Sequence, residues 1–205
     1  MLAIVDYRMG NIHSLSNALA FLGCEVRVSR DPEVLLAADK LILPGVGAFD
    51  AAMANLRTFG LVGVLDEAVK GRGVPVLGIC VGMQIMASRG TENGLTEGLG
   101  WIDGTVEAIA PMISETPVPH VGFNDVSFPA GNEDLVGGFA GPTDFYFVHG
   151  YHMACIDPAD RAGTVDYGGK VLTAMVRRSN VLGVQFHPEK SQSNGLKLLA
   201  AFLKY

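Results

Sequence analysis

The sequence predicts an α/β fold of three layers, in which a mostly parallel central sheet carries helices on both faces. Two observations indicate this architecture. In the first half of the chain, short continuous apolar runs alternate with amphipathic stretches, which is typical of parallel strands buried on both faces. After residue 100, strand-like segments follow one another across Gly, Pro and Asp turns. This succession of strand-like segments and turns predicts an additional antiparallel β section in the second half.

Four apolar runs in the first half are expected to be strands, because each is short, continuous and bounded by turn residues. Helical segments separate them. In residues 11–22, for example, Ile12, Leu15, Leu19 and Leu22 share one helical face. The predicted strands are 2–6, 25–29, 40–45 and 74–80, and the other predicted helices are 49–57, 61–71 and 81–88.

The second half is expected to be rich in β-structure and to end in a helix. At the C-terminus, Leu196, Leu199, Ala200 and Leu203 form an apolar stripe at helical spacing. No internal repeat, charged tail or linker interrupts the pattern, so residues 1–205 are expected to form a single domain. The strand-like segments of this half are 101–110, 118–128, 144–153, 164–178 and 181–187.

The composition excludes several classes of protein. Of 205 residues, 49% are hydrophobic and 18% are charged, which supplies a sizeable core and excludes a disordered chain. The net charge of −6 argues against a nucleic-acid partner. No apolar segment reaches the roughly 20 residues of a membrane span, and the N-terminus lacks a signal-peptide pattern. Because Cys24, Cys80 and Cys155 show no paired spacing, we expect no disulfide framework and a cytoplasmic location.

Cys80 stands between two glycines, in the order Gly78-Ile79-Cys80-Val81-Gly82, where a predicted strand changes into a predicted helix. A nucleophile at such a turn has strained backbone angles, and the glycines let neighbouring elements come close. The helix N-terminus would favour the thiolate, and the N–H of Val81 is placed to stabilise an oxyanion. The alternative is a core cysteine between two packing glycines.

A histidine suited to general-base catalysis stands near the C-terminus. A thiol nucleophile needs a base that takes its proton and returns it to the leaving group, and the pKa of histidine suits neutral pH. His187 ends an apolar strand, so its imidazole is expected at the same edge of the sheet as Cys80. Glu189 is placed to bond the second ring nitrogen, and Pro188 stiffens the spacing. The alternative is a turn capped by a carboxylate.

A glycine-rich turn follows the predicted strand 40–45 and contains Val46 and Gly47. Exposed backbone amides in such a turn would supply a second oxyanion donor from either residue. The alternative is an ordinary strand-to-helix turn, with Phe49 beginning the helix.

No metal or other cofactor is expected. His149 and His152 are three apart in a strand-like segment, so they are predicted to point to opposite faces and not to share a metal ion. No phosphate-binding loop occurs in the chain.

Three motifs together resemble the class I (triad) glutamine amidotransferase family: PGVGAF at 44–49, GICVGMQ at 78–84 and FHPEKSQ at 186–192. Within that family, the chain is similar to the glutaminase subunits of imidazole glycerol phosphate synthase, from histidine biosynthesis. The resemblance covers nearly the whole chain. The segments that carry the further likeness are DYRMGN (6–11), TEGLGW (96–101), VPHVGFN (118–124), DFYFVHGYH (144–152), DYGGK (166–170) and KSQSNG (190–195).

The resemblance implies a Cys-His-Glu triad that hydrolyses glutamine to glutamate and ammonia. Cys80 would attack the side-chain amide of glutamine. His187 would protonate the departing ammonia and then activate water, while Glu189 orients His187. Matching positions imply that the carboxylate of Glu92 faces the α-ammonium group of the substrate. The four residues implied to hold the glutamine are Gln84, Glu92, Gly150 and Tyr151.

The resemblance also implies a partner. Ammonia would pass, shielded from water, to a cyclase subunit built as a (β/α)8 barrel, and the two chains would form a heterodimer. Asn11, Tyr146 and Lys190 match positions expected at the interface between the subunits.

The chain departs from the family pattern at four positions. Val81 replaces a more usual leucine, and Phe123 replaces a usual tryptophan. Arg8 stands where glycine is usual; if that position needs a positive φ, arginine costs roughly 1–2 kcal/mol. Gly150 stands where a serine is expected, and the lost hydroxyl would weaken glutamine binding by about 1 kcal/mol.

Three other functions are compatible with the sequence. A paralogous glutaminase would feed ammonia to another synthase, for example one for sugar amidation, and the triad does not separate it from the first function. A catalytically silent regulatory subunit would have no need for Cys80, His187 and Glu189 together. A cysteine hydrolase acting on thioesters or peptides would differ by failing to turn over glutamine.

Overall fold

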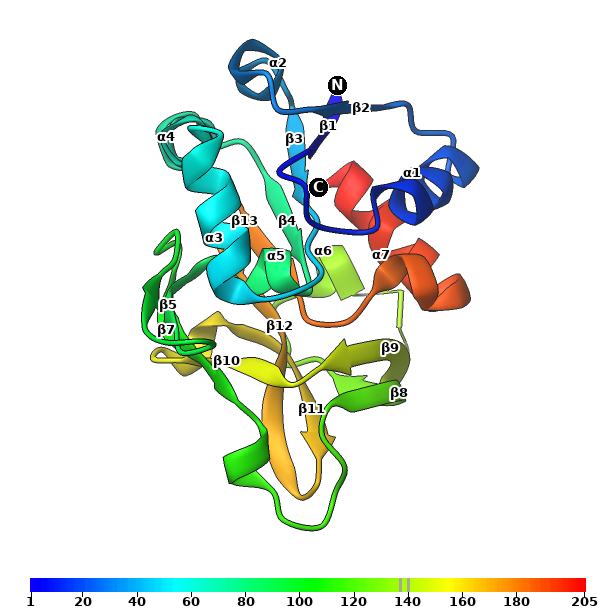
Figure 1. The fold of residues 1–205 in the computed structure, drawn as a ribbon. Coiled ribbons are helices and arrows are strands. Elements are labelled where there is room, and N and C mark those ends of the chain that lie inside the picture. The colour runs from blue at the N-terminus through cyan, green and yellow to red at the C-terminus, as the bar shows by residue number, and fades with distance from the viewer. Residues whose placement is uncertain (137, 140) are drawn as a thin grey trace.

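The computed structural model describes residues 1–136, 138–139 and 141–205. Within these residues, a nine-stranded sheet has the order β2-β1-β3-β4-β13-β12-β11-β8-β9, and a four-stranded sheet has the order β10-β7-β5-β6 (Figure 1). The strands are β1 (Leu2–Val5), β2 (Val26–Ser29), β3 (Lys40–Leu43), β4 (Val76–Ile79), β5 (Ala87–Gly90), β6 (Thr96–Glu97), β7 (Ile102–Ala108), β8 (His120–Ser127), β9 (Thr143–His149), β10 (Tyr151–Cys155), β11 (Arg161–Tyr167), β12 (Lys170–Arg178) and β13 (Val181–Val184).

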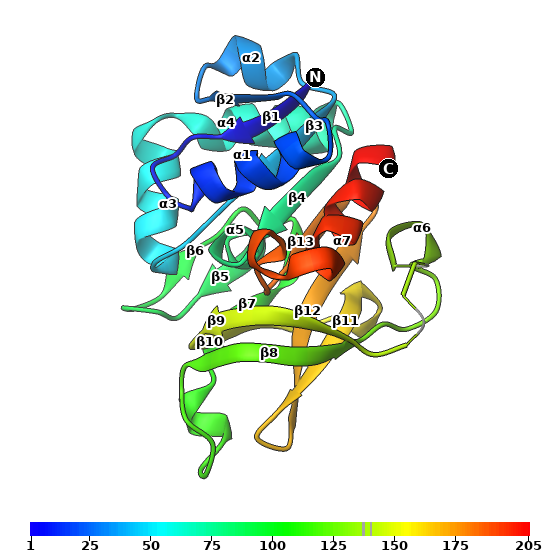
Figure 2. The same cartoon turned by 90° about the vertical axis from the view of Figure 1, so that its right-hand side faces the viewer.

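Helices cover both faces of the parallel part of the large sheet. Figures 1 and 2 show α3 and α4 on one face, and α1 and α7 on the other. No helix formed by the described residues is long and apolar enough to cross a membrane. The α-helices are α1 (Ile12–Phe21), α2 (Pro32–Leu36), α3 (Phe49–Thr58), α4 (Leu61–Asp66), α5 (Val81–Gln84), α6 (Glu133–Val136) and α7 (Gln192–Lys204), with a π-helical turn at Glu67–Gly71 and 3-10 turns at Ala110–Met112, Pro158–Asp160 and Pro188–Lys190.

The large sheet is parallel at one end and antiparallel at the other. Strands β2, β1, β3, β4 and β13 pair in parallel, whereas β12, β11, β8 and β9 continue the sheet in antiparallel pairing. All four residues of β1, β4 and β13 are buried, as expected for strands covered on both faces. The predicted three-layer α/β fold with an added antiparallel section is therefore confirmed.

Three neighbouring strands end at the same edge of the sheet. Strand β4 lies between β3 and β13, with Gly78 beside Leu43 and Ile79 beside Val184. The segments that follow these strands thus meet at one place, although they come from distant parts of the sequence. This is the carboxyl edge, where ligands bind in open α/β sheets.

The predicted helix 81–88 is wrong in its length. Helix α5 ends at Gln84, and residues from Ala87 onward form strand β5, which pairs with β7. The cause is non-local. The carbonyl of Ile85 accepts from the N–H of Leu99 at 2.8 Å, so a distant segment takes the place of the next helical turn. Short buried apolar runs have the same composition in helices and in strands.

The segment predicted as one strand, 144–153, belongs to two sheets. Strand β9 is the edge of the large sheet, and β10 is the edge of the small one. Gly150 joins them, and its carbonyl accepts from the N–H of Ile109 at 2.9 Å. The crossing between the sheets brings this turn over the carboxyl edge of the large sheet, close to α5 (Figure 1).

Candidate active site

Cys80 lies in a sharp turn between β4 and α5. Its backbone has φ 53° and ψ −111°, which is a strained conformation for a residue other than glycine. The N–H of Cys80 donates to the carbonyl of Val184 at 2.8 Å, and its carbonyl accepts from the N–H of Gln84 at 3.0 Å. The turn is therefore held from both sides, with the thiol at the end of the strand.

The glycines beside Cys80 are required by close contact between backbones. A Cβ atom at Gly82 would lie 1.8 Å from the carbonyl oxygen of Leu43, on strand β3. A Cβ atom at Gly78 would lie 2.6 Å from the carbonyl oxygen of Gly82. Both distances are far below van der Waals contact, so side chains at these positions would push the turn away from the sheet. The N-terminus of the following helix was expected to favour the thiolate form of Cys80. Because α5 has only four residues, this effect comes from the backbone amides of a single turn.

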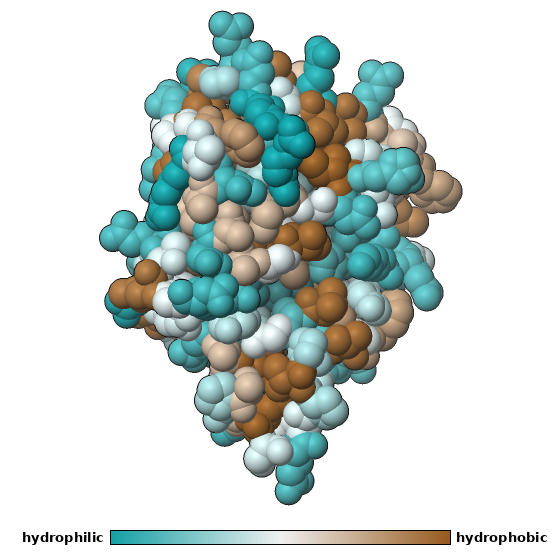
Figure 3. Space-filling model, in the orientation of Figure 1, coloured by the Kyte–Doolittle hydropathy of each residue, from teal (hydrophilic) through white to brown (hydrophobic). Residues whose placement is uncertain are grey.

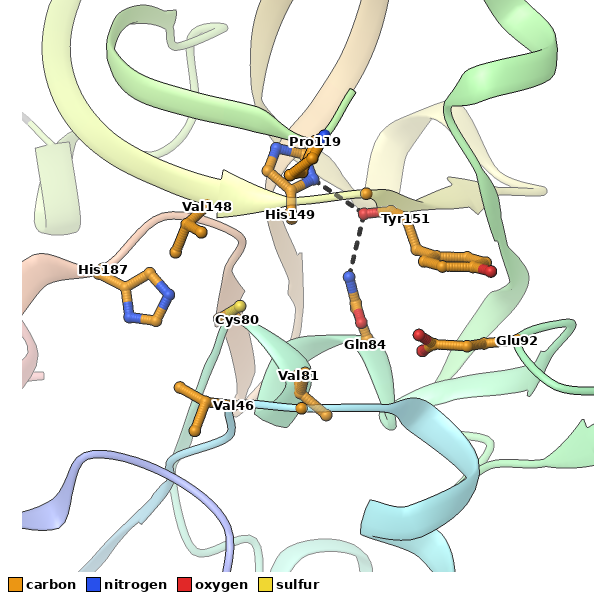
Figure 4. A pocket seen from close by; sticks show the side chains of 12 residues that line it. Val46, Cys80, Val81, Gln84, Glu92, Pro119, Val148, His149, Tyr151 and His187 are labelled. Atoms are coloured by element: carbon orange, nitrogen blue, oxygen red, sulfur yellow. Dashed lines mark hydrogen bonds between the residues drawn. The ribbon is translucent and has the colours of Figure 1, made fainter. Parts of the chain in front are cut away.

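His187 and Glu189 form a buried pair beside the turn. The Nδ1 atom of His187 lies 2.9 Å from Oε1 of Glu189, and the two side chains are 2% and 4% exposed. The backbone N–H of His187 donates to the carbonyl of Tyr146 at 2.8 Å, which ties the turn to β9. The second ring nitrogen, Nε2, makes no hydrogen bond within the described residues, and the ring faces Cys80 (Figure 4).

The surroundings of His187 favour its charged form. Burial by itself lowers the pKa of this imidazole, but its interactions with Cys80 and with Glu189 outweigh burial. The pKa of His187 is raised to about 9. An imidazolium opposite a thiolate is the arrangement that a cysteine nucleophile requires at neutral pH.

A cavity of about 390 Å³ opens in front of Cys80 (Figure 4). Most of the residues predicted for the site come together there, although they lie on five separate segments of the chain. Glu189 is the exception, because it lies behind His187 and lines a smaller hollow with Asn11. The predicted residues that line the cavity are Val46, Gly47, Cys80, Val81, Gln84, Glu92, Gly150, Tyr151 and His187.

Gln84 and Glu92 reach toward the cavity from the end opposite His187 (Figure 4). The Nε2 atom of Gln84 donates to the carbonyl of Tyr151 at 3.0 Å. The Oε2 atom of Glu92 accepts from the N–H of Phe49, the first residue of α3, at 2.9 Å. This leaves the second carboxylate oxygen of Glu92 for a cation in the cavity, such as an ammonium group.

Two polar side chains to which the sequence interpretation gave no role in the site also belong to this region. His149 lines the cavity, and its Nδ1 donates to the carbonyl of Tyr151 at 2.8 Å. Burial lowers the pKa of His149 to about 3, so it is neutral and does not add a charge to the cavity. Gln185 is fully buried, and its Nε2 lies 3.7 Å from the sulfur of Cys80. Its position two residues before His187 was the only sequence signal for it.

Among the described residues, no group of three His, Cys, Asp or Glu side chains is arranged to hold a metal ion. The chemistry that these residues offer is that of a cysteine nucleophile, a histidine acid and base, and a carboxylate that orients the histidine.

A family model described as glutamine amidotransferase class-I matches residues 3–204. The chain belongs to the class-I glutamine amidotransferase family. The resemblance inferred from the three motifs is thereby confirmed. The match spans nearly the whole chain, from strand β1 to helix α7.

Relatives with high identity carry the same name. The imidazole glycerol phosphate synthase subunit HisH of Rhodospirillum rubrum is 47% identical, and the alignment covers 99% of this chain and 98% of that protein. The subunit of the same name from Ruegeria pomeroyi is 46% identical, with 99% and 98% covered. Subunit HisH 2 of Methanococcus maripaludis is 40% identical, with 100% and 99% covered. These amidotransferase relatives match this chain from end to end.

Solved structures agree on the fold. A crystal structure titled glutamine amidotransferase has a TM-score of 0.76 at 22% identity and covers 99% of this chain and 97% of its own. The structure of PurLQS from Thermotoga maritima also has a TM-score of 0.76, at 19% identity, with 100% and 97% covered. At these identities the likeness concerns the class-I amidotransferase fold.

Two departures from the family pattern now have a structural description. Arg8 has φ 66°, so the position does require the left-handed conformation, and arginine adopts it at the expected cost of roughly 1–2 kcal/mol. At Gly150, a Cβ atom would meet its nearest neighbour, Val118, at 3.8 Å. A serine would therefore fit there, and the chain lacks the hydroxyl for a reason other than space.

The three residues predicted for a partner interface lie around the triad. The Nζ atom of Lys190 lies 5.6 Å from the centre of the Tyr146 ring. Asn11 is exposed at the start of α1, where its side chain accepts from the N–H of Ser14 at 3.3 Å. Tyr146 and Lys190 are thus brought together, and Asn11 lines the hollow that Glu189 also lines.

Proposed function

We propose that this chain is the glutaminase subunit of an imidazole glycerol phosphate synthase, with residues 1–205 forming a single amidotransferase domain in the cytoplasm. It would hydrolyse glutamine to glutamate and ammonia and supply the ammonia to a synthase in histidine biosynthesis. One observation carries the proposal. Cys80, strained in its turn, faces the free nitrogen of a histidine that is itself oriented by Glu189, at the floor of a cavity. The similarity to the HisH subunits supports the choice of synthase.

In the first step, the thiolate of Cys80 attacks the side-chain carbonyl carbon of glutamine. A carbon–sulfur bond forms, and the carbonyl oxygen takes up the negative charge. Backbone N–H groups of Val81 and of Val46 or Gly47 stabilise that oxyanion. The imidazolium of His187 then gives its proton to the departing nitrogen, so the carbon–nitrogen bond breaks and ammonia leaves a thioester on Cys80.

In the second step, water attacks the thioester. His187, now neutral, takes a proton from the water as the carbon–oxygen bond forms. The carbon–sulfur bond then breaks, which releases glutamate and restores the thiolate and imidazolium pair. Glu189 keeps the imidazole oriented in both steps and stabilises its charged form.

The cavity suits the two ends of a glutamine molecule. The substrate amide lies at Cys80, and the α-ammonium group lies near the carboxylate of Glu92 at the opposite end. Gln84 and the backbone at Gly150 and Tyr151 supply the remaining polar contacts. Such a site has the usual form of a small-molecule pocket, with few polar groups that fix the orientation of the ligand.

The expected partner is a cyclase subunit built as a (β/α)8 barrel, which would form a heterodimer with this chain and receive the ammonia. Strands β8 and β9 carry an exposed strip of cross-strand pairs, Val121 with Val148 and Phe123 with Tyr146. We call these four residues the β8–β9 strip. Val121, Phe123 and Val148 are 56%, 46% and 37% exposed, and Val148 also lines the cavity. The strip, together with Lys190 and Asn11, is the proposed interface.

The apolar strip lies on the β-rich half of the molecule. Figure 3 shows apolar side chains among polar ones over that half of the face seen in Figure 1. A mixed surface of this kind, with exposed aromatic side chains, is typical of protein–protein interfaces. A partner docked there would cover the mouth of the cavity and shield the ammonia from water.

The test is glutamate release from glutamine by the purified chain, alone and with the cyclase subunit and its ribonucleotide ligand. We expect slow turnover alone and strong stimulation by the pair. Cys80→Ala is expected to abolish turnover while partner binding is retained. Cys155→Ala is the matched control, because that thiol lies outside the cavity, and it should leave turnover within about twofold of wild type.

Three outcomes would contradict the proposal in different ways. If the cyclase does not stimulate glutamine turnover, the chain supplies ammonia to another synthase. No turnover under any condition would favour a silent regulatory subunit. Retained turnover in Cys80→Ala would refute the assignment of the nucleophile.

A further inference from the structure

Gln185 is a buried polar side chain to which the reaction described above gives no role. It follows strand β13, and its backbone N–H donates to the carbonyl of Ala174 at 2.8 Å, which fixes the chain beside β12. Its side chain is 0% exposed, and its Nε2 atom lies 3.7 Å from the sulfur of Cys80. A buried amide is unfavourable unless its polar atoms are hydrogen-bonded, so these contacts account for its presence.

The orientation of the Gln185 amide follows from its neighbours. The carbonyl of Tyr151 can only accept, so the group of Gln84 that lies 3.0 Å from it must be the NH2 group. The same NH2 group lies 3.0 Å from the side chain of Gln185 and must meet an oxygen there. The NH2 group of Gln185 is therefore turned toward Cys80. These hydrogen bonds are compatible with only one orientation of the Gln185 amide.

Other groups near the sulfur are already engaged. The hydroxyl of Tyr7 donates to the carbonyl of Pro44, and the Nδ1 of His149 donates to a backbone carbonyl. Glu92 and Glu189 are acceptors and have no proton to give when ionised. The hydroxyl end of Tyr151 points away from Cys80, toward the far end of the cavity (Figure 4). Among the described residues, the side-chain donors left for the sulfur are therefore His187 and Gln185. The titratable groups around Cys80 and its cavity are Tyr7, Glu92, His149, Tyr151, His187 and Glu189.

We propose that Gln185 is a positioning residue for the nucleophile, whose side-chain amide donates a hydrogen bond to the thiolate of Cys80 and is itself held in place by Gln84. The inference rests on the proposed function, in which Cys80 attacks glutamine. It adds to His187 a second donor, whose protonation state does not change during the reaction.

A neutral donor suits this place for a physical reason. His187 changes its charge twice in each catalytic cycle, so its support for the sulfur varies. The amide of Gln185 does not titrate, and its bond to a thiolate is stronger than its bond to a neutral thiol. Gln185 thus favours the thiolate before it attacks glutamine, and again when glutamate leaves and the thiolate returns.

The test measures the thiolate directly, without glutamine turnover. The full chain is treated with iodoacetamide over a range of pH, and alkylation of Cys80 is followed by mass spectrometry of its peptide, which separates it from Cys24 and Cys155. Gln185→Met removes the donor with little change of volume. We expect its midpoint for alkylation to move to higher pH by about half a unit or more, with a roughly threefold slower reaction at neutral pH. Gln185→Glu keeps the size but replaces the donor by an acceptor, and its midpoint is expected to move further.

Val176→Ala is the matched control, because Val176 lies on the neighbouring strand β12, is equally buried and does not line the cavity. It should lower stability but leave the alkylation midpoint of Cys80 unchanged. A midpoint in Gln185→Met equal to that of wild type, or an equal shift in Val176→Ala, overturns the inference. If Cys80 of the wild-type chain reacts no faster than Cys24 at any pH, the nucleophile assignment itself fails, and the inference fails with it.

Discussion

His187 is held as an imidazolium by its two neighbours. Burial opposes the charge, but Cys80 and Glu189 raise the pKa of His187 to about 9, above the value of about 6.5 expected in an unfolded chain. The charged form therefore stabilises the fold fully below about pH 6.5, and this contribution is lost as the pH rises through about 9. In the proposed mechanism, the same titration removes the proton that the leaving ammonia requires.

Glu189→Gln tests this description at the scale of one residue. The substitution removes a negative charge that raises the pKa of His187, so the alkaline limb of the kcat/KM profile should move from about pH 9 toward neutral pH. The orientation of the imidazole is also weakened, and we expect kcat to fall roughly 100-fold. The measurement is the pH dependence of glutamate release by the complex.

Glu25→Gln serves as the control for Glu189→Gln, because Glu25 is exposed and lies outside the cavity. It should leave both the alkaline limb of the kcat/KM profile and kcat itself unchanged. An alkaline limb that stays near pH 9 in Glu189→Gln would contradict the role given to Glu189.

At the scale of elements, the nucleophile turn depends on how closely β3 and α5 approach each other. Gly82 is the point of contact, since a Cβ atom there would lie 1.8 Å from the carbonyl oxygen of Leu43. That neighbour is the backbone of a buried residue, in a strand whose last three residues are all buried, and it cannot move aside cheaply. A glycine is thus required at this position by the short distance between β3 and α5, in addition to the backbone conformation of the turn.

Gly82→Ala is expected to displace α5 and with it the N–H of Val81. We predict a loss of at least about 2 kcal/mol in the free energy of unfolding and a loss of glutaminase activity. Gly63→Ala, in helix α4, is the matched control, because nothing lies within 4 Å of its added Cβ atom. It should raise stability by about 0.5–1 kcal/mol. Urea unfolding of both variants checks this, and equal stabilities would refute the account of Gly82.

At the scale of the whole molecule, the proposed function implies that the surface around the cavity determines which synthase receives the ammonia. The proposed β8–β9 strip begins at the cavity and includes Phe123, whose ring packs edge-on against that of Tyr146 at 5.5 Å. Aromatic side chains at the centre of an interface contribute a large share of binding energy. A smaller residue at this position should therefore weaken the complex without affecting the fold.

Phe123→Ser is predicted to weaken binding to the cyclase about tenfold, with the unfolding free energy of the free chain nearly unchanged. Isothermal titration calorimetry measures the first quantity and urea unfolding the second. Phe21→Ser is the matched control, since Phe21 is 79% exposed at the end of α1, outside the strip. Equal affinities for the two variants would exclude the strip as the interface.

Much of this protein is determined by local sequence. Continuous apolar runs separated by amphipathic segments were sufficient to predict the parallel half of the sheet. The reason is that a strand buried on both faces is apolar at successive positions. The motifs around Cys80, His187 and Glu189 were sufficient to predict the family, and the resemblance then indicated most of the residues that line the cavity. The positive φ of Arg8 was considered as a possibility from the sequence, since a glycine is usual at that position.

Other features were decided only by the tertiary structure. Helix α5 ends early because the distant segment 98–102 donates to the carbonyls of residues 85–88, which follow it. Residues 144–153 divide between two sheets because each half pairs with a different strand. The bonds from Gln185 to Gln84 and to Cys80 join residues that are 101 and 105 positions apart. The physical reason is the same in each case. A sequence pattern records how deeply a residue is buried, whereas the hydrogen-bond partner that makes its burial possible is known only when distant strands have come together.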